Sequence, residues 1–304
     1  MDALEMVSLG EQEIAVRIWH PQASRTLIAW HGLARHGGDF DDFARLLGPE
    51  WRVLAPDTPG RGLSSWSFYP SREYLYAHYL KVAVAVLDHF ALARVPWVGT
   101  SMGGLVGMLL AAQAPTAHRI ERLVLNDVGP ELDLQGLADI GRYFGMAHRF
   151  TCLADLEAEL RRHYTGFGID SDVAWRRLAL GSARRLPDGS WTYHYDPRIA
   201  EQFLHDTPRD TWTDWRALRC PLMVVRGEHS PLLRPDSLTR MGQAQPGLVT
   251  LEAAGCGHAP LLDRESQVRP IIDFLHRPRE NFGDRPRERA TPPWWQRTLR
   301  WLGS

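Results

Sequence analysis

A serine lies in a pattern that could make it a nucleophile, within segment 99–103, which reads Gly-Thr-Ser-Met-Gly. An apolar run typical of a strand ends at Val98, and a run with helical character begins at Leu105. Glycines on both sides of Ser101 permit the sharp strand-to-helix turn that this pattern requires. At the start of a helix, free amides and the helix dipole favour negative charge. We therefore interpret Ser101 as a nucleophile; a chance match in a glycine-rich turn is the alternative.

A serine needs a base to become reactive, and one of the 13 histidines lies where such a base is expected. His258 follows Gly257 in a glycine-flanked loop, after the last strand-like run and before a C-terminal helical segment. Such a loop can bring its side chain over the carboxyl ends of the strands, where open α/β sheets bind ligands. The order of serine first and histidine last is that of serine hydrolases built on such sheets. We predict that His258 is the base, the alternative being a turn histidine that hydrogen-bonds its own backbone.

Two backbone amides are expected to stabilise the negative charge that develops on a substrate oxygen. One belongs to Met102, which follows the nucleophile, and the other to Leu33, which follows an earlier strand-like run. Gly32 lets the backbone approach closely at that point. We interpret His31 as a residue that holds this loop by hydrogen bonds, not as a second base.

These residues must be positioned by strands that end at one edge of a sheet. Short apolar runs typical of strands lie at 12–19, 26–30, 52–55, 95–99, 122–126, 221–226 and 248–252. Segments with helical periodicity lie between several of them, at 39–47, 72–90 and 101–113. This alternation predicts βαβ units and a mostly parallel sheet covered by helices on both faces.

The alternation breaks between about 131 and 216, a stretch too long for a simple loop. Three helices are predicted in it, followed by a polar turn at 187–190; the helices span 134–147, 153–163 and 171–182. The stretch also contains four tryptophans, at positions 175, 191, 212 and 215. We interpret it as a helical cap inserted into the sheet domain.

Four motifs, in order along the chain, resemble those of the α/β-hydrolase superfamily, in its branch of cap-bearing bacterial esterases and C–C-bond hydrolases. They are His31-Gly32, Asp57-x-Pro59-Gly60-x-Gly62-x-Ser64, Gly99-x-Ser101-x-Gly103-Gly104 and Gly255-x-Gly257-His258. The resemblance covers about residues 10–276 and implies the α/β-hydrolase fold, with its mostly parallel sheet, flanking helices and inserted cap. The expected organisation is a core at 1–130 and 217–276, a cap at 131–216 and a tail at 277–304.

The carboxylate that should orient the histidine is where the chain departs from the family pattern. In most relatives the acid follows the strand after the cap, where this chain has Ser230 and Pro231. Asp127 is one candidate, because some members place the acid after the earlier strand; it could instead only cap the turn into the insertion. Glu228 is a second candidate, although it lies close to the end of its strand. A third possibility is that no proper acid exists, which can cost about 10⁴-fold in rate.

The whole-chain composition, 44% hydrophobic and 23% charged, is that of a globular protein. A net charge of -1 gives no electrostatic footprint for nucleic acid. The 3 cysteines are widely spaced and predict neither a disulfide framework nor a zinc site, so we expect no metal or organic cofactor. The chain shows neither a signal-peptide pattern nor the roughly 20 consecutive apolar residues of a membrane helix. We therefore expect a cytoplasmic protein.

Segment 277–304 differs from the rest of the chain, because it has seven arginines against three acidic residues. Three of the 12 tryptophans lie in its last 11 residues. Together with Leu299 and Leu302 they could form a short basic amphipathic helix that binds a membrane surface or a protein partner. A tail that folds back on its own domain or stays disordered is the alternative.

Together these residues predict a serine hydrolase that cleaves the carboxylic ester of a small-to-medium apolar molecule through an acyl-enzyme on Ser101. The tryptophan-rich cap favours such a substrate, since ligand pockets are lined mainly by hydrophobic groups. A lactone, or a carbon–carbon bond beside a ketone, is the alternative substrate. A non-catalytic ligand receptor on the same fold is the alternative from another class.

Overall fold

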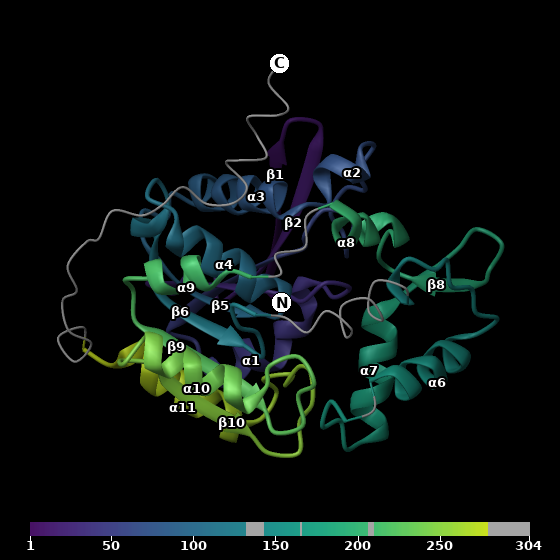
Figure 1. Ribbon diagram of the computed structural model, residues 1–304. Coiled ribbons are helices and arrows are strands. Elements are labelled where there is room, and N and C mark those ends of the chain that lie inside the picture. Colours follow the sequence, from purple (N-terminus) through teal and green to yellow (C-terminus); the bar gives the residue numbers. More distant parts are fainter. Residues whose placement is uncertain (132–142, 165, 206–209, 279–304) are drawn as a thin grey trace.

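The computed structural model describes residues 1–131, 143–164, 166–205 and 210–278, which form an eight-stranded sheet at the centre of the molecule (Figure 1). The order across the sheet is β1-β2-β4-β3-β5-β6-β9-β10. The strands are β1 (Ala3–Leu9), β2 (Gln12–Trp19), β3 (Arg25–Trp30), β4 (Trp51–Pro56), β5 (Val95–Thr100), β6 (Ile120–Asn126), β9 (Leu222–Gly227) and β10 (Val249–Ala253). The pairs β1–β2 and β2–β4 are antiparallel and the others are parallel. The predicted mostly parallel sheet is therefore confirmed.

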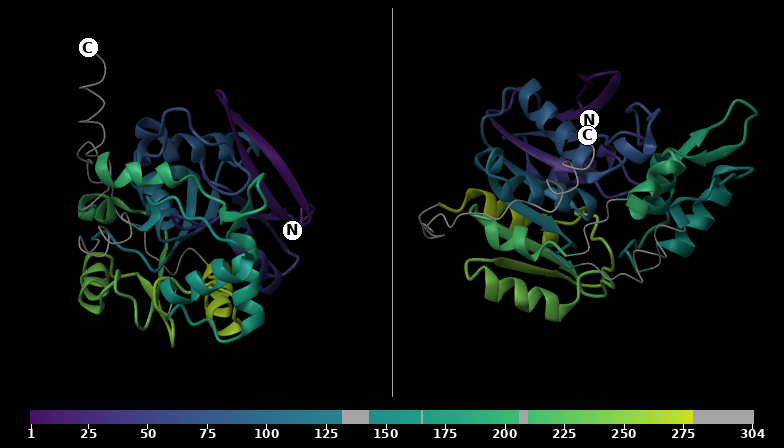
Figure 2. Two further views of the ribbon diagram at one scale, coloured as in Figure 1. Left: turned by 90° about the vertical axis from the view of Figure 1, so that its right-hand side faces the viewer. Right: turned by 45° about the horizontal axis from the view of Figure 1, so that its top comes forward.

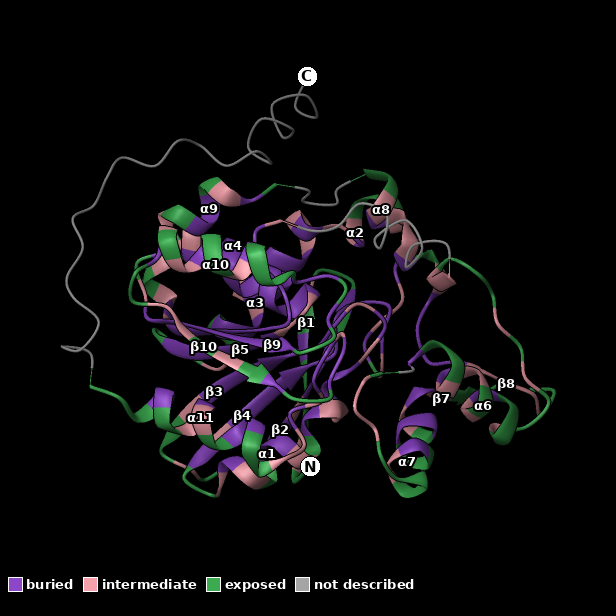
Figure 3. Ribbon diagram, turned by 60° about the horizontal axis from the view of Figure 1, so that its bottom comes forward, coloured by how far each residue is buried: buried purple, intermediate pink, exposed green. Residues whose placement is uncertain are grey.

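Helices cover both faces of this sheet (Figure 3). On one face lie α1 (Asp41–Leu47) and α11 (Glu265–His276), and on the other lie α3 (Tyr76–His89), α4 (Met102–Ala112), α9 (Trp212–Ala217) and α10 (Pro235–Ala244). Parallel strands enclosed in this way need apolar side chains on both sides. Accordingly, every residue of β9 is buried, and so is all of α4 except Ala112. The apolar runs of the sequence are thus the central strands and the helix behind the serine.

The insertion between β6 and β9 lies largely to one side of the sheet, as Figure 1 and the right-hand view of Figure 2 show. Its described elements are α6 (Leu153–His163), α7 (Asp172–Ser182), the hairpin β7 (Ala183–Arg185) and β8 (Trp191–Tyr193), the 3-10 helix η3 (Pro197–Ala200) and α8 (Glu201–His205), together with α9, which covers the sheet. The two helices predicted at 153–163 and 171–182 match α6 and α7, and the polar turn joins β7 to β8. The helix predicted at 134–147 falls mostly outside the described residues.

Several elements differ from the sequence-based expectation, among them one edge strand and one helix. The edge strand β1 was not predicted, because within it only Val7 is buried and no apolar run marks it. The helix expected at 72–90 is divided into α2 (Pro70–Glu73) and α3, with the break at Tyr74 and Leu75. Tyr74 is buried and donates its hydroxyl to Asp196 of the insertion at 2.8 Å. The helix is thus interrupted where Tyr74 contacts the insertion, and the local sequence periodicity does not indicate this interruption.

The tryptophan-bearing tail lies almost wholly outside the described residues, which end at 278. Within the described part of the chain, no helix has both the length and the apolar character needed to cross a membrane.

Candidate active site

Ser101 lies at the turn between β5 and α4 with φ 50° and ψ -115°. A non-glycine residue with positive φ is uncommon and needs support from its surroundings. That support comes from glycine: a Cβ at Gly99 would collide with the backbone of Gly103, and one at Gly103 would collide with the carbonyl of Trp30. The Ser101 amide also donates to the Asn126 carbonyl of the next strand, at 2.9 Å. The turn is therefore held on three sides and presents the Ser101 hydroxyl outward.

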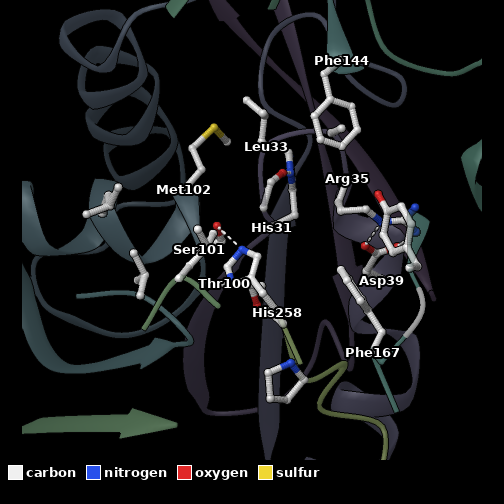
Figure 4. Close-up of a pocket in the computed structure, with 18 of the residues that line it drawn as sticks. His31, Leu33, Arg35, Asp39, Thr100, Ser101, Met102, Phe144, Phe167 and His258 are labelled. Carbon is white, nitrogen blue, oxygen red and sulfur yellow. Dashed lines mark hydrogen bonds and ion pairs between the residues drawn. The ribbon is translucent and has the colours of Figure 1, made fainter. Parts of the chain in front are cut away.

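His258 faces Ser101 directly, with 2.9 Å between His258 Nε2 and Ser101 Oγ (Figure 4). On its other side, Nδ1 lies 2.7 Å from Oδ2 of Asp127. A carboxylate can only accept, so Nδ1 carries the proton and Nε2 accepts from the serine hydroxyl. The structure thus brings together Ser101, His258 and Asp127 in an unbroken chain of hydrogen bonds. This is the arrangement in which a histidine can take the proton of a serine.

Asp127 is fully buried, so its carboxylate depends on protein donors. The Gly227 amide donates to Oδ1 at 2.9 Å, and the Ser230 hydroxyl donates to Oδ2 at 2.6 Å. With His258 this makes three donors to one carboxylate. Asp127 itself adopts φ 57°, a conformation that Asp tolerates better than most residues.

Glu228, the alternative acid, points elsewhere. Its carboxylate accepts a hydrogen bond from the Gly255 amide at 2.8 Å and is 45% exposed. It therefore supports the loop that carries His258 without contacting His258.

The two amides expected to stabilise an oxyanion belong to residues that line the same pocket as Ser101. Met102 is the first residue of α4, so its amide has no acceptor within the helix. Among the described residues, no acceptor is bound to the amide of Met102 or to that of Leu33. A Cβ added to Gly32 would approach the Cβ of Ser101 to 3.6 Å, which places the Leu33 loop beside the serine. Both amides are thus available to a substrate oxygen.

His31 holds this loop from inside the protein. The Thr58 amide donates to Nε2 at 2.9 Å, so the proton lies on Nδ1, which donates to the Gly32 carbonyl at 2.6 Å. Burial lowers the pKa of His31 to about 4, which keeps the ring neutral at physiological pH. His31 therefore holds the loop of Gly32 to the loop of Thr58 by hydrogen bonds.

Arg61 is a fully buried arginine that contacts both amide-bearing residues. Its Nε donates to the Leu33 carbonyl at 2.8 Å, and its Nη2 lies 3.8 Å from the Met102 sulfur. Its Nη1 donates to the Pro59 carbonyl at 2.7 Å and to the Tyr79 hydroxyl at 2.8 Å. No carboxylate of the described residues lies within ion-pair distance of this guanidinium. The sequence alone did not single it out.

The pocket around Ser101 has a volume of about 400 Å³ and a mostly apolar lining. The core contributes Leu105, Val128 and Leu232, and the insertion contributes Phe144 and Phe167. Figure 4 shows one polar part of the wall on the side of Phe167, where the pair formed by Arg35 and Asp39 faces the pocket.

Arg35 and Asp39 form a bidentate pair, with both N···O distances 2.6 Å. Burial by itself raises the pKa of the Asp39 carboxyl, but the adjacent Arg35 guanidinium outweighs it, and the net pKa is lowered. From the sequence, Asp39 was assigned only to a segment with helical periodicity, at 39–47. A role in the pocket wall could not be seen without knowing that Arg35 pairs with Asp39 four residues later.

Comparison with known proteins shows the family to which the chain belongs. The family described as "Alpha/beta hydrolase family" matches residues 27–270 of the chain. The chain belongs to the α/β-hydrolase family. Within it, the chain is 33% identical to a 3-hydroxybutyrate-oligomer hydrolase of Cupriavidus necator, over 88% of this chain and 94% of that protein. It is 30% identical to an esterase of Mycobacterium tuberculosis, over 75% of this chain and 73% of that protein.

A solved α/β hydrolase from Novosphingobium aromaticivorans has a similar structure, with a TM-score of 0.82 and 33% sequence identity. The alignment covers 90% of this chain and 97% of that one. This α/β hydrolase therefore shares the fold of a solved relative over nearly the whole of its described length. Among its described residues, no group of three or more His, Cys, Asp or Glu side chains could hold a metal ion.

Proposed function

We propose that this α/β hydrolase is a serine hydrolase that cleaves the carboxylic ester of a small-to-medium apolar substrate through an acyl-enzyme on Ser101. The observation that carries the proposal is the hydrogen-bond chain from Ser101 Oγ through His258 to Asp127, at 2.9 and 2.7 Å. A serine alone is a weak nucleophile, and this chain supplies the base and the group that orients it.

In this mechanism Ser101 Oγ forms a bond to the ester carbonyl carbon while its proton passes to His258 Nε2. The carbonyl oxygen becomes an oxyanion that accepts hydrogen bonds from the amides of Leu33 and Met102. The carbonyl then re-forms, the bond to the alcohol oxygen breaks, and His258 gives its proton to the departing alcohol. A water molecule attacks the acyl-enzyme by the same steps and releases the acid. Asp127 stays ionised and stabilises the imidazolium.

The insertion at 131–216 is proposed to act as a cap that determines which substrates enter. Its aromatic residues Phe144, Tyr164 and Phe167 line the pocket opposite the serine-bearing core. A cavity of about 400 Å³ with this lining suits an apolar acyl or alcohol group of modest size.

Within this class, we favour short esters of hydroxy acids as substrates. The relative from Cupriavidus necator is named as a hydrolase of 3-hydroxybutyrate oligomers. The pocket of this chain offers a matching feature, because the Asp39 carboxylate keeps lone pairs that Arg35 does not use and can accept from a substrate hydroxyl. The negative charge of Asp39 in turn disfavours a free carboxylate at that point.

The test is a substrate panel measured with the wild-type protein and with Ser101→Ala. It comprises p-nitrophenyl esters of increasing acyl length, 3-hydroxybutyrate dimer and trimer, and a lactone. We expect hydrolysis of short and medium esters, turnover of the hydroxybutyrate oligomers, and loss of activity by about 10⁴-fold or more in Ser101→Ala.

Labelling with a fluorophosphonate separates the enzyme from the receptor alternative. The probe should modify Ser101 in the wild type and leave Ser101→Ala unmodified. Wild-type protein that resists the probe at high concentration and hydrolyses no ester would be a receptor. Turnover of the lactone alone would instead favour the alternative substrate class.

A further inference from the structure

Ser230 lies at the family's usual acid position and contacts Asp127, the acid that this chain uses instead. Asp127 follows β6 and Ser230 follows β9, and these two strands are parallel neighbours in the sheet. The loops at their carboxyl ends therefore lie side by side. Ser230 Oγ lies 2.6 Å from Asp127 Oδ2, the same oxygen that accepts from His258 Nδ1 at 2.7 Å.

The direction of the Ser230 hydrogen bond is fixed by its other contacts. Ser230 Oγ accepts from the amide of Leu232 at 3.3 Å and from that of Leu233 at 3.1 Å. A hydroxyl has one proton and two acceptor lone pairs. Both lone pairs are occupied by amides, so the proton is committed to the Asp127 carboxylate. Ser230 is 7% exposed, which leaves little room for water to replace it.

Asp127 needs this support because its carboxylate is fully buried and depends on protein donors. The Gly227 amide fixes Oδ1, and Ser230 fixes Oδ2 on the side that faces His258. Without Ser230, the carboxylate could rotate about its side-chain bond, and Oδ2 would no longer be held in line with Nδ1. A donor to a carboxylate also stabilises its ionised form.

We propose that Ser230 is a positioning residue that holds the Asp127 carboxylate against His258, and that positions 127 and 230 are interchangeable as acid and hydroxyl. This inference rests on the serine-hydrolase function proposed above. It explains the departure from the family pattern: the loop after β9 supplies the hydrogen-bond donor, and the loop after β6 supplies the acid.

The first test is Ser230→Ala, assayed with p-nitrophenyl butyrate. We expect kcat to fall about tenfold while KM changes less than twofold, because Ser230 does not itself line the pocket and contacts its lining only through the backbone amide of Leu232. The NMR signal of the His258 Nδ1 proton should shift and exchange faster with water, which a merely structural change would not cause. The matched control is Ser67→Ala. Ser67 is also a buried serine whose hydroxyl donates to a carboxylate, Glu73 at 2.5 Å, and accepts from an amide, that of Tyr69 at 2.7 Å.

The second test exchanges the two side chains. Asp127→Ser alone should lower kcat by about 10³- to 10⁴-fold. Adding Ser230→Asp to it should restore at least tenfold, because the carboxylate then comes from the loop after β9 and the hydroxyl introduced at position 127 can donate to it. This double variant tests the proposal even if Ser230→Ala folds poorly.

The two proposals fail in different ways. If Ser230→Ala matches Ser67→Ala in kcat and leaves the His258 proton signal unchanged, or if a folded double variant is no more active than Asp127→Ser, Ser230 does not position the acid. If the wild type hydrolyses no ester, the proposed function fails, while the NMR signal still reports whether Ser230 holds Asp127 against His258.

Discussion

Arg61 is a buried cation that contacts Leu33 and Met102, the two residues whose amides face the substrate oxygen. Its guanidinium lies over the rings of Tyr74 and Tyr79, with 5.6 and 5.2 Å to the ring centroids, and donates to the Leu33 carbonyl. Burying a charge is costly unless it is hydrogen-bonded. Here the charge lies beside the residues whose amides face the developing oxyanion, where a positive potential favours the transition state. Arg61 is therefore expected to influence catalysis without touching the substrate.

Replacing Arg61 by Met removes the charge and the donors while keeping most of the volume. We predict that kcat/KM for p-nitrophenyl butyrate falls about tenfold, equal to about 1.4 kcal/mol of transition-state stabilisation. The free energy of unfolding should also fall, since the Leu33 and Pro59 carbonyls lose their donor.

Arg122→Met is the matched control, because Arg122 is also buried, donates to the Phe274 and Arg277 carbonyls and lies over the Phe274 ring. It is far from the pocket and should lose stability only. Equal kcat/KM in the two variants would mean that Arg61 has no electrostatic role.

The residues of the site differ in how well the sequence predicts them. The sequence predicted that Ser101 and His258 lie at the carboxyl edge, because flanking glycines and neighbouring strands place both in tight turns there. The acid stayed open between Asp127, Glu228 and no proper acid, because the choice depends on which side chain reaches His258 across the sheet. That reach follows from the pairing of β6 with β9, which no local pattern encodes. Arg61 and Arg35 were missed for the same reason, because Arg61 contacts Leu33 and Met102, and Arg35 contacts Ser182, across long stretches of sequence.

At the scale of elements, the ends of β5 and β6 hold the loop that carries His258. Asn126 closes β6, and its Nδ2 donates to the Thr100 hydroxyl at 3.0 Å and to the Pro260 carbonyl at 2.8 Å. Asn126 is fully buried, so these donors cannot be replaced by water. The bond to Pro260 joins a strand end to the loop two residues after His258.

Asn126→Leu keeps the number and branching of the side-chain heavy atoms and removes both donors. We predict a loss of about 1 to 3 kcal/mol in the free energy of unfolding, because the Pro260 carbonyl is left without its partner. We also predict a fall in kcat of about tenfold, because the His258 loop loses its attachment to the sheet and misplaced catalytic groups react slowly.

The control for Asn126→Leu is Gln245→Leu. Gln245 is also a buried amide, and it donates to the Trp215 carbonyl at 2.7 Å, away from the site. Measured by urea unfolding and ester hydrolysis, Gln245→Leu should lose stability and keep its kcat per folded molecule. If Asn126→Leu behaves in the same way, its contact with Pro260 has no bearing on catalysis.

Among the elements, the sequence predicted the central strands and the edge strand β10 but missed the edge strand β1. A strand enclosed on both faces buries every residue, as β9 does, and the apolar run that begins it, Leu222–Val225, is visible in one sequence. The edge strand β1 exposes most of its residues and offers no such signal. The hairpin of β7 and β8 has three residues in each strand, too few for an alternation to be recognised.

At the scale of the whole molecule, polar contacts join the insertion to the core at many points, and three of them involve residues of the pocket wall, the His258 loop and the hairpin. The Gly257 amide beside His258 donates to the Gly166 carbonyl of the insertion at 2.5 Å. Arg35 in the pocket wall donates to Ser182 at the end of α7, also at 2.5 Å. On the core side of the hairpin, His194 Nδ1 accepts from the Gly62 amide at 2.9 Å. The orientation of the insertion over the pocket depends on these links, and the sequence could not predict them because each joins residues about 90 to 150 positions apart.

One of these links is sensitive to acid. His194 and His36 are both buried, their rings meet edge to face with 4.8 Å between centroids, and each Nδ1 accepts from a backbone amide. Each proton therefore lies on Nε2, and within the described chain neither Nε2 has a hydrogen-bond partner. Burial, followed by the proximity of His36, Arg35, His31 and Arg61, lowers the pKa of His194 well below its usual value. Burial likewise lowers the pKa of His36.

The sign of the resulting pH dependence follows from linkage. Below about pH 6.5 the unfolded chain binds protons at these histidines while the folded chain does not, so the free energy of unfolding falls as the pH falls. Each such group contributes a slope of up to about 1.4 kcal/mol per pH unit until its folded-state pKa is reached.

We predict that His194→Asn lowers the slope of unfolding free energy against pH between about pH 6.5 and pH 5, by the contribution of one histidine. The Oδ1 of the introduced asparagine can still accept from the Gly62 amide. Urea unfolding at several pH values measures this slope, and His118→Asn, which replaces an exposed histidine, should keep the wild-type slope. If His194→Asn also kept that slope, the buried pair would not be the origin of the acid sensitivity, and the link between hairpin and core would have to be independent of protonation.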